Sequence, residues 1–290
     1  MDDYREPFLP QRPPILVRVL EPEPPPPRRR WVLAASLFLL TCATTFLVGG
    51  PVYAAAVMTI LTTHELGHFL QARRYGVVAS LPYFIPMPLP PLGTMGAIIA
   101  MGSRIPHRRA LFDIGASGPL AGLVPAIACA VVGIQRSTVQ PIPQGEPNLW
   151  FGEPLLFQLL SRLIHGPIPD DQALFLHPLA FAGWVGIFIT ALNLTPIGQL
   201  DGGHVLYAML GRRAHAVAIA LLGAAIVAVI AGRYWHWSLI LVLLIVFGPR
   251  HPPTADDRWP LDRRRWLLGW LTLAFLVLGF TPTPWTVELP

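Results

Sequence analysis

Long apolar runs separated by short polar segments make up most of the chain. The pattern predicts an all-α polytopic membrane protein with 6–7 transmembrane helices. About 20 apolar residues are needed to cross a hydrocarbon layer of about 30 Å. The first five runs reach or approach that length, whereas the last two are short. Runs 214–231 and 235–248 could instead form one re-entrant hairpin, which would not change the orientation of the chain. The candidate spans are residues 31–49, 52–72, 111–134, 178–195, 214–231, 235–248 and 266–280.

Two further stretches are neither spans nor ordinary loops. Residues 82–102 hold too many Pro and Gly for a long helix and too many apolar residues for a solvated loop. A short re-entrant, β-like hairpin that lines a cavity inside the protein satisfies both constraints. The 136–177 segment contains an amphipathic piece around residues 155–164, which we expect to lie at the membrane surface.

The composition agrees with a membrane protein. Hydrophobic residues make up 53% of the chain and charged residues only 13%, whereas soluble domains average about 25% charged residues. This excludes collagen-like, disulfide-rich and fully disordered classes. Cys42 and Cys129 both lie inside apolar runs, so we expect them to be small buried residues and not a disulfide framework.

The basic residues are all Arg, and their distribution predicts an orientation. With the N-terminus inside, 18 of the 21 fall in cytoplasmic segments; the exceptions are Arg136, Arg162 and Arg233. This asymmetry follows the positive-inside rule, so the net charge of +5 points to the lipid bilayer and not to nucleic acid. Residues 1–30 are rich in Pro and Arg and are expected to be a disordered cytoplasmic tail ahead of a retained signal-anchor, with a Pro-rich docking motif as the alternative.

The second apolar run contains polar residues that are costly inside a membrane. His64 and His68 are four residues apart, so both imidazoles project from one face of a helix, with Glu65 beside them. This spacing lets two His bind one metal ion while a carboxylate reaches water near it. A lone HExxH pattern can arise by chance, and a lone His is more often a hydrogen-bonded core residue. Because all three groups share one apolar span, a bound divalent cation is favoured here.

A zinc site with an open position needs a third protein ligand. Asp201 is the best candidate, because it follows a Pro/Gly break in the fourth long apolar stretch and lies, like His68, near the cytoplasmic side. We expect His204 to be an interfacial residue, with a supporting role beside the metal as the alternative. Asp113 is expected to stabilise the N-terminus of its span.

These motifs resemble those of the site-2 protease family, whose members are intramembrane zinc metalloproteases. The resemblance rests on His64-Glu-Leu-Gly-His68 in one span and Asn193-Leu-Thr-Pro-Ile-Gly-Gln-Leu-Asp-Gly202 in a later one. The intervening Phe112–Gly122 stretch is similar to the family's third core helix, which contains Gly and Pro. The similarity runs from about residue 52 to 211. It is greatest to the branch without a PDZ domain, because the 136–177 segment has no room for one.

The resemblance implies an intramembrane zinc metalloendopeptidase with a three-helix catalytic core. His64, His68 and Asp201 would bind Zn²⁺, Glu65 would be the general base, and Asn193 would hold the substrate or the oxyanion. The chemistry agrees, since zinc lowers the pKa of water towards about 7 and a carboxylate can then take its proton. The implied substrate is a membrane protein cut in or near a transmembrane segment, in a regulatory role.

The hairpin and the small residues of the third core helix are the remaining candidates. A strand-like hairpin could pair with an unwound substrate segment, and a packed plug is the alternative. We therefore take Gly93, Thr94, Met95 and Gly96 as candidate substrate-binding residues. The glycines at 115, 118 and 122 permit close approach of their span to its neighbours, which is a structural role.

The predicted organisation has three parts: the tail (1–30), a membrane-embedded metalloprotease core (31–211) and C-terminal transmembrane helices (212–290). Two other functions stay open, a transmembrane divalent-metal transporter and an inactive scaffold of the same fold. A homo-oligomer is also left open. The absence of Lys indicates a GC-rich genome and favours a bacterial plasma membrane, with an organelle as the alternative.

Overall fold

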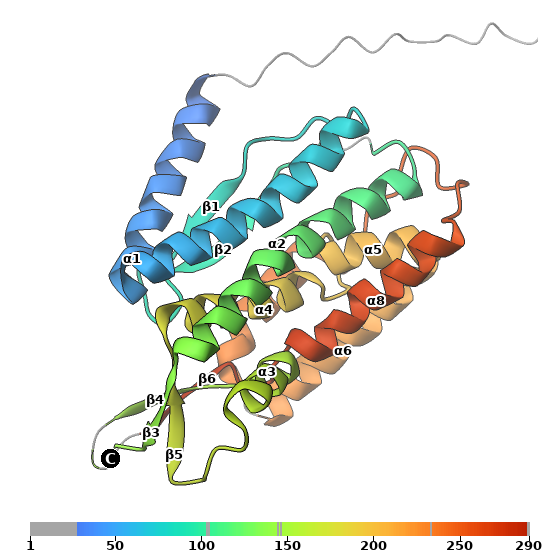
Figure 1. Cartoon of the computed structure of the whole chain (residues 1–290). Helices are drawn as coiled ribbons and strands as arrows, with labels where there is room; N and C mark the ends of the chain where they lie inside the picture. Colours follow the sequence, from blue (N-terminus) through green and yellow to red (C-terminus); the bar gives the residue numbers. More distant parts are fainter. Residues whose placement is uncertain (1–27, 103–104, 144, 146, 233, 289–290) are drawn as a thin grey trace, which may run out of the picture.

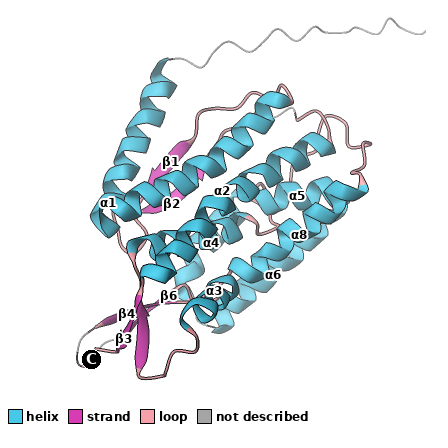
Figure 2. Cartoon of the chain, in the orientation of Figure 1, coloured by secondary structure: helices cyan, strands magenta, loops and turns pink. Residues whose placement is uncertain are grey.

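A computed structural model describes residues 28–102, 105–143, 145, 147–232 and 234–288. The predicted tail lies outside the described residues except for its last three positions. The described chain is mostly helical, as predicted, with three two-stranded antiparallel sheets (Figures 1 and 2).

Helix α1 (Arg28–Arg74) contains the first two predicted spans, joined at a sharp bend (Figure 1). Gly50 lies at the bend with φ 74° and ψ −174°, and Pro51 follows it. Glycine adopts a positive φ without steric cost, and proline cannot donate a hydrogen bond to the preceding turn, so the helix changes direction there. The two runs are therefore two helical segments joined directly at Gly50, with no loop between them.

The core forms where the second half of α1 packs against α2 (Arg108–Arg136) and α4 (Pro178–Asn193). Large side chains such as Ile60 and Trp184 are buried there. Gly183 and Gly186 of α4 lie directly against Ala130 and Ala126 of α2. Because these contacts involve no large side chain, the two backbones approach closely, as is common between membrane helices.

The chain then leaves the core through shorter helices. Helix α5 (Asp201–Leu210) continues through a 3₁₀ turn, η1 (Gly211–Arg213), into α6 (Ala214–Gly232). A second 3₁₀ turn, η2 (Trp235–Trp237), precedes α7 (Ser238–Phe247), and α8 (Arg263–Gly279) follows. All seven predicted apolar runs are thus helical over most of their length. Helices α6 and α7 expose many large apolar side chains, which suits contact with lipid.

Three described helical stretches are long and apolar enough to cross a membrane: Arg30–Arg74, Arg108–Arg136 and Asp201–Gly232. The apolar stretches Pro178–Asn193 and Trp235–Phe247 are shorter. The prediction of a helical membrane protein is therefore confirmed, and its figure of 6–7 spans stays a prediction.

The predicted β-like hairpin is present. Strands β1 (Tyr83–Pro86) and β2 (Thr94–Ile98) pair antiparallel. Two hydrogen bonds attach the connection between them to α1: Thr44 Oγ1 donates to Gly93 O (2.7 Å), and Tyr53 Oη donates to Leu92 O (2.6 Å). The hairpin is therefore packed beside both halves of the bent helix.

The 136–177 segment contains the predicted amphipathic helix, α3 (Leu155–His165). It also forms strands that the alternation of residues did not reveal. Strand β3 (Thr138–Pro141) pairs with β5 (Gln172–Phe175), and β4 (Asn148–Phe151) pairs with β6 (Trp285–Glu288) from beyond α8. Each strand has four residues, which is too short to produce a clear period-2 pattern.

The arginines gather at one end of the molecule. The C-terminus of α1 and the N-termini of α2 and α8 lie together at what we call the Arg-rich end, while α3 and strands β3–β6 lie at the opposite, strand end (Figure 1). This arrangement agrees with the one-sided distribution of Arg along the sequence.

Candidate metal centre

Three predicted ligands come together inside the helical core. His64 and His68 extend from the second half of α1, and Asp201 is the first residue of α5. His64 Nε2 is 3.1 Å from Asp201 Oδ2, and His68 Nε2 is 3.2 Å from Asp201 Oδ1. The two Nε2 atoms are 3.2 Å apart. One donor atom from each residue therefore points to a common position.

The donor set and its spacing fit a zinc ion. Zinc takes imidazole nitrogen and carboxylate oxygen at about 2.0–2.2 Å in tetrahedral sites, which places neighbouring donor atoms about 3.3 Å apart. The 3.2 Å between the two Nε2 atoms matches this value, and each Nε2 lies a similar distance from one oxygen of the Asp201 carboxylate, 3.1 Å from Oδ2 for His64 and 3.2 Å from Oδ1 for His68. Three protein ligands also leave the fourth tetrahedral position open, as in catalytic zinc sites.

A backbone carbonyl of α2 fixes the protonation of His68. His68 Nδ1 is 2.8 Å from Ile114 O. A carbonyl oxygen can only accept, so Nδ1 carries the proton and Nε2 presents its lone pair to the common position. Ile114 is itself next to Asp113, whose carboxylate accepts two hydrogen bonds from Arg265 of α8 (2.7 and 2.8 Å). Asp113 therefore attaches α2 to α8, so it does more than stabilise the helix N-terminus.

Glycines of α2 provide the space for the imidazoles of the candidate metal centre. A Cβ added at Gly118 would overlap the His68 ring, and one added at Gly122 would lie 2.9 Å from His64 Cβ. One at Gly115 would lie 2.7 Å from His204 Cβ. The close approach predicted for these glycines is therefore confirmed, and it is the histidine side chains that occupy the space.

A break between α4 and α5 directs Asp201 toward the histidines. Gly198 has φ 59° in this turn, and Gly202 and Gly203 lie directly against the carbonyl oxygens of residues 194 and 198. The break allows a new helix to begin at Asp201, where the carboxylate also interacts favourably with the helix N-terminus. The Pro/Gly signal in the sequence thus has a direct structural counterpart.

The cluster is almost fully enclosed. His64 and Glu65 are each 4% exposed and His68 is 6% exposed, while the Asp201 side chain retains 13%. Glu65 lies between the two histidines on α1 and within electrostatic range of all three ligands. Buried charges of this kind require a compensating partner, and a divalent cation provides one.

The expectation that His204 is an interfacial residue is wrong. Its side chain is 6% exposed, and its Nδ1 is 2.6 Å from Nε2 of His251, which is also 6% exposed. His251 was not a sequence candidate, because it lies in a polar connection 47 residues later and in no recognisable motif. The fold alone brings the two rings together.

The other predicted site residues lie in the expected elements. Asn193 is the last residue of α4, so the break that positions Asp201 begins directly after it. In the hairpin, Thr94 is buried, and its Oγ1 donates to Ile85 O and accepts from the Gly96 N–H. Met95 is 41% exposed. Thr94 therefore holds the hairpin together from inside, whereas Met95 is accessible.

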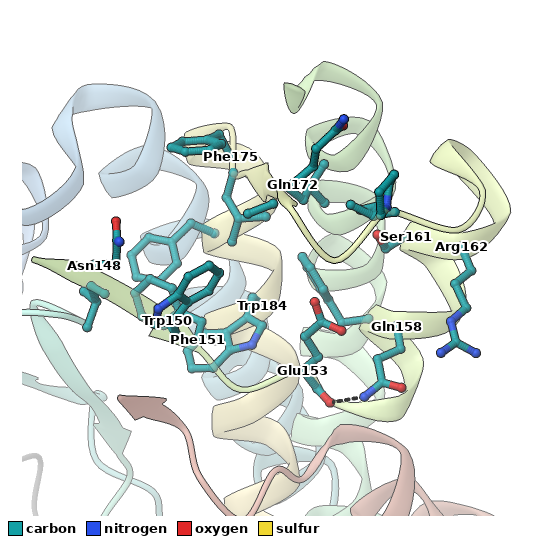
Figure 3. A pocket seen from close by; sticks show the side chains of 18 of the residues that line it. Asn148, Trp150, Phe151, Glu153, Gln158, Ser161, Arg162, Gln172, Phe175 and Trp184 are labelled. Atoms are coloured by element: carbon teal, nitrogen blue, oxygen red, sulfur yellow. Dashed lines mark hydrogen bonds between the residues drawn. The ribbon is translucent and has the colours of Figure 1, made fainter. Parts of the chain in front are cut away.

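A large cavity lies elsewhere, at the strand end (Figure 3). It encloses about 710 Å³ beside α3, β4 and β5. Trp150, Phe151 and Trp184 contribute apolar surface to it, and Glu153 and Arg162 contribute charge. None of the predicted site residues lines it, so it has no part in the metal chemistry.

Comparisons with known proteins agree with this centre. The family model for peptidase family M50 matches residues 52–231, which extends beyond residue 211, where the resemblance was expected to end. The probable zinc metalloprotease EGY1, chloroplastic, of Arabidopsis thaliana is 39% identical over 166 residues, covering 56% of this chain and 30% of the relative. The probable zinc metalloprotease EGY2, chloroplastic, of Oryza sativa subsp. indica is 31% identical over 248 residues, covering 82% and 44%.

The chain thus spans less than half the length of these relatives. No solved structure matches it. The relatives are named for zinc, and the described residues that can hold it are His64, His68 and Asp201. Since the family model covers more than half of the sequence and includes all three candidate ligands, the chain belongs to peptidase family M50, the site-2 protease family.

Proposed function

We propose that the protein is a zinc metalloendopeptidase that hydrolyses peptide bonds in or near transmembrane segments of membrane-protein substrates. The observation that carries this proposal is the meeting of three metal-ligating side chains from α1 and α5. Both belong to helical stretches that are apolar enough to cross a membrane. A hydrolytic centre on such helices is placed to act on substrates within the bilayer.

We assign His64, His68 and Asp201 as the zinc ligands. Zinc held there supplies Lewis acidity toward a peptide carbonyl and lowers the pKa of water towards about 7. Glu65, enclosed beside the ligands, accepts the proton of the attacking water and returns it to the leaving amine. Asn193, at the end of α4, donates its amide N–H to the oxygen that becomes negative.

We assign the Gly93–Gly96 part of the hairpin to substrate binding. Among the described strands β2 pairs with β1 alone, so its other edge has no strand partner, and an added strand is the way in which we propose that substrate binds. The exposed Met95 gives this edge an apolar contact surface. A substrate helix has to unwind before its peptide bonds become accessible, and pairing with β2 stabilises the extended form.

We propose 6–7 membrane spans, a catalytic core over 31–211 with C-terminal helices over 212–290, and a regulatory role for the cleavage. Self-association is compatible with the exposed apolar faces of α6 and α7.

The names of EGY1 and EGY2 place those proteins in chloroplasts, so they give no support to the expected bacterial plasma membrane. We therefore propose an integral membrane protein whose Arg-rich end lies on the inner side of the membrane, without specifying which membrane.

Transport of a divalent metal is the weaker candidate. A transport path needs binding sites at several depths. Among the described residues, His64, His68 and Asp201 are the one group of three that could hold a metal. A single enclosed site favours chemistry over passage.

Replacing Asp201 by Ala tests the metal centre. We expect the zinc content of the purified protein to fall from about one ion per chain to a small fraction of that, because two imidazoles alone hold zinc weakly. Cleavage of a co-expressed single-span protein should be lost with it. Zinc content is measured by mass spectrometry of the metal after dialysis.

Asp170→Ala is the matched control, since Asp170 is an exposed aspartate at the strand end. This variant should keep both zinc and cleavage. Undiminished zinc in Asp201→Ala would remove Asp201 from the ligand set. Full zinc in the unaltered protein with no cleavage of any membrane-anchored substrate would instead refute the peptidase assignment.

Cysteine labelling tests the orientation. In a background with Cys42 and Cys129 replaced by Ala, single cysteines at the exposed positions Asp170 and Arg264 lie at opposite ends of the molecule. We expect an impermeant maleimide to label the Asp170 position in intact cells and the Arg264 position only after the membrane is opened. The reverse order would invert the assigned topology.

A further inference from the structure

A polar connection between α7 and α8, residues 249–257, crosses the Arg-rich end and contacts α5 along its length (Figure 1). Pro249 O accepts a hydrogen bond from the Gly198 N–H, just before α5. His251 bonds to His204, and Asp257 Oδ2 accepts from Tyr207 Oη at 2.7 Å. We call this segment the α7–α8 connection. It contains none of the proposed zinc ligands and does not include Glu65, the proposed general base.

The hydrogen bond between the two histidines has a defined direction. His251 Nδ1 is 2.6 Å from Pro252 O, so Nδ1 carries a proton and donates it. Burial lowers the pKa of His251 to about 4, so the ring is neutral near pH 7 and its Nε2 is an acceptor. His204 Nδ1–H, 2.6 Å away, is the donor.

His251 is itself held firmly. Its ring stacks on Tyr207 with centroids 4.7 Å apart, and its carbonyl oxygen accepts from His215 Nε2 at 3.1 Å. Farther along, Thr254 Oγ1 donates to Asp257 Oδ1 at 2.7 Å. The acceptor offered to His204 therefore has a fixed position, supported from α5, α6 and the connection itself.

Helix α5 is short (Asp201–Leu210), so contacts at its side chains oppose its rotation about its own axis. His204 is nearly one turn after Asp201, and Tyr207 is nearly one turn further. On the opposite side, His204 Cβ packs against Gly115 of α2. The His204 ring is thereby held between α2 and the α7–α8 connection. A small rotation of α5 moves Asp201 Oδ1 and Oδ2 away from the two His Nε2 atoms.

We propose that His251 is a positioning residue for the zinc centre: by accepting the His204 hydrogen bond, it fixes the rotation of α5 and so the orientation of the Asp201 carboxylate. This proposal rests on the assignment of His64, His68 and Asp201 as zinc ligands. It gives the α7–α8 connection a defined part in a site whose proposed ligands all lie at least 50 residues before His251.

Two amide substitutions at position 251 separate positioning from packing. In His251→Gln the side chain is long enough to place an amide oxygen near the position of Nε2, whereas His251→Asn is too short. The probe is the metal alone: zinc affinity of the purified protein by chelator competition, and the visible spectrum of the Co²⁺-loaded form, which reports ligand geometry. Arg250→Ala is the control, because Arg250 lies in the same connection, next to His251, and its side chain is exposed.

We expect His251→Asn to bind zinc about 10–100-fold more weakly and to change the Co²⁺ spectrum, because α5 would then be free to turn the Asp201 carboxylate away from the histidines; this is the usual range for losing a contact that orients a metal ligand. His251→Gln should stay within about threefold of the unaltered protein, because it restores the acceptor. Equal affinities and spectra for the Asn variant and the unaltered protein would overturn the proposal. So would a Gln variant as weak as the Asn variant.

If His251→Asn does not fold, Tyr207→Phe provides the second test, since it removes only the hydroxyl that bonds to Asp257. We expect a loss of zinc affinity of less than about tenfold with the same spectral change, and an unchanged spectrum would contradict the proposal. These measurements do not depend on proteolysis. If the unaltered protein binds zinc but cleaves no substrate, and the Asn variant binds zinc more weakly, the peptidase is refuted and the positioning role stands. Absence of zinc from the unaltered protein refutes both.

Discussion

Glu65→Gln is expected to reduce cleavage of a membrane-anchored substrate by about 10²–10⁴-fold while zinc stays bound. Glutamine keeps the size of the side chain, so the enclosed space beside His64 and His68 stays filled. Its amide cannot accept a proton from water at neutral pH, so the step assigned to Glu65 is lost. Cleavage is measured as product formation in detergent or liposomes, and zinc by metal analysis of the same sample.

Glu153→Gln makes the same change at the strand end, in the wall of the cavity of Figure 3, and should leave cleavage unaltered. If Glu65→Gln cleaves as fast as the unaltered protein, Glu65 is not the base. A Glu65→Gln protein that has lost its zinc would instead indicate a role in holding the metal.

Gly118→Ala is expected to abolish zinc binding, and cleavage with it, through a single added methyl group. A Cβ at this position overlaps the His68 imidazole, and the ring cannot move away because its Nδ1 is hydrogen-bonded to Ile114 O. Alanine is about 1 kcal/mol better than glycine inside a helix, so α2 itself is not weakened. The loss would therefore report the displaced His68. It is measured as zinc content, with circular dichroism to verify the helices.

Gly223→Ala is the matched control. It makes the same substitution in α6, where an added Cβ meets nothing within 4 Å. We expect this variant to keep zinc and cleavage at the unaltered level. A Gly118→Ala protein with full zinc would show that α2 and α1 can separate without harm to the centre, contrary to the packing described above.

The meeting of His64, His68 and Asp201 could be predicted from the sequence because its signals are local. His64 and His68 are one helical turn apart in an apolar run, so their joint use requires no knowledge of the fold. Asp201 was found by a second local signal, the Pro/Gly break before it. Both parts of the candidate metal centre, the His pair and Asp201, could be predicted because each is marked by a pattern in its own stretch of sequence.

The contacts of His204 could not be read in this way. Its surroundings are set by Gly115 on one side and His251 on the other, 89 and 47 residues away. Nothing in the spacing of either residue indicates the pairing. The β4–β6 pair was missed for a related reason, since partners Asn148 and Glu288 are distant and both strands are short.

The pairing of β4 with β6 also bears on biosynthesis. Helix α8 is attached to earlier parts of the chain at both ends, by Arg265 to Asp113 and by β6 to β4. A ribosome delivers the N-terminal helices first. The strand end can close only once Trp285–Glu288 have emerged, so the pairing of β4 waits for a partner that is translated after α8.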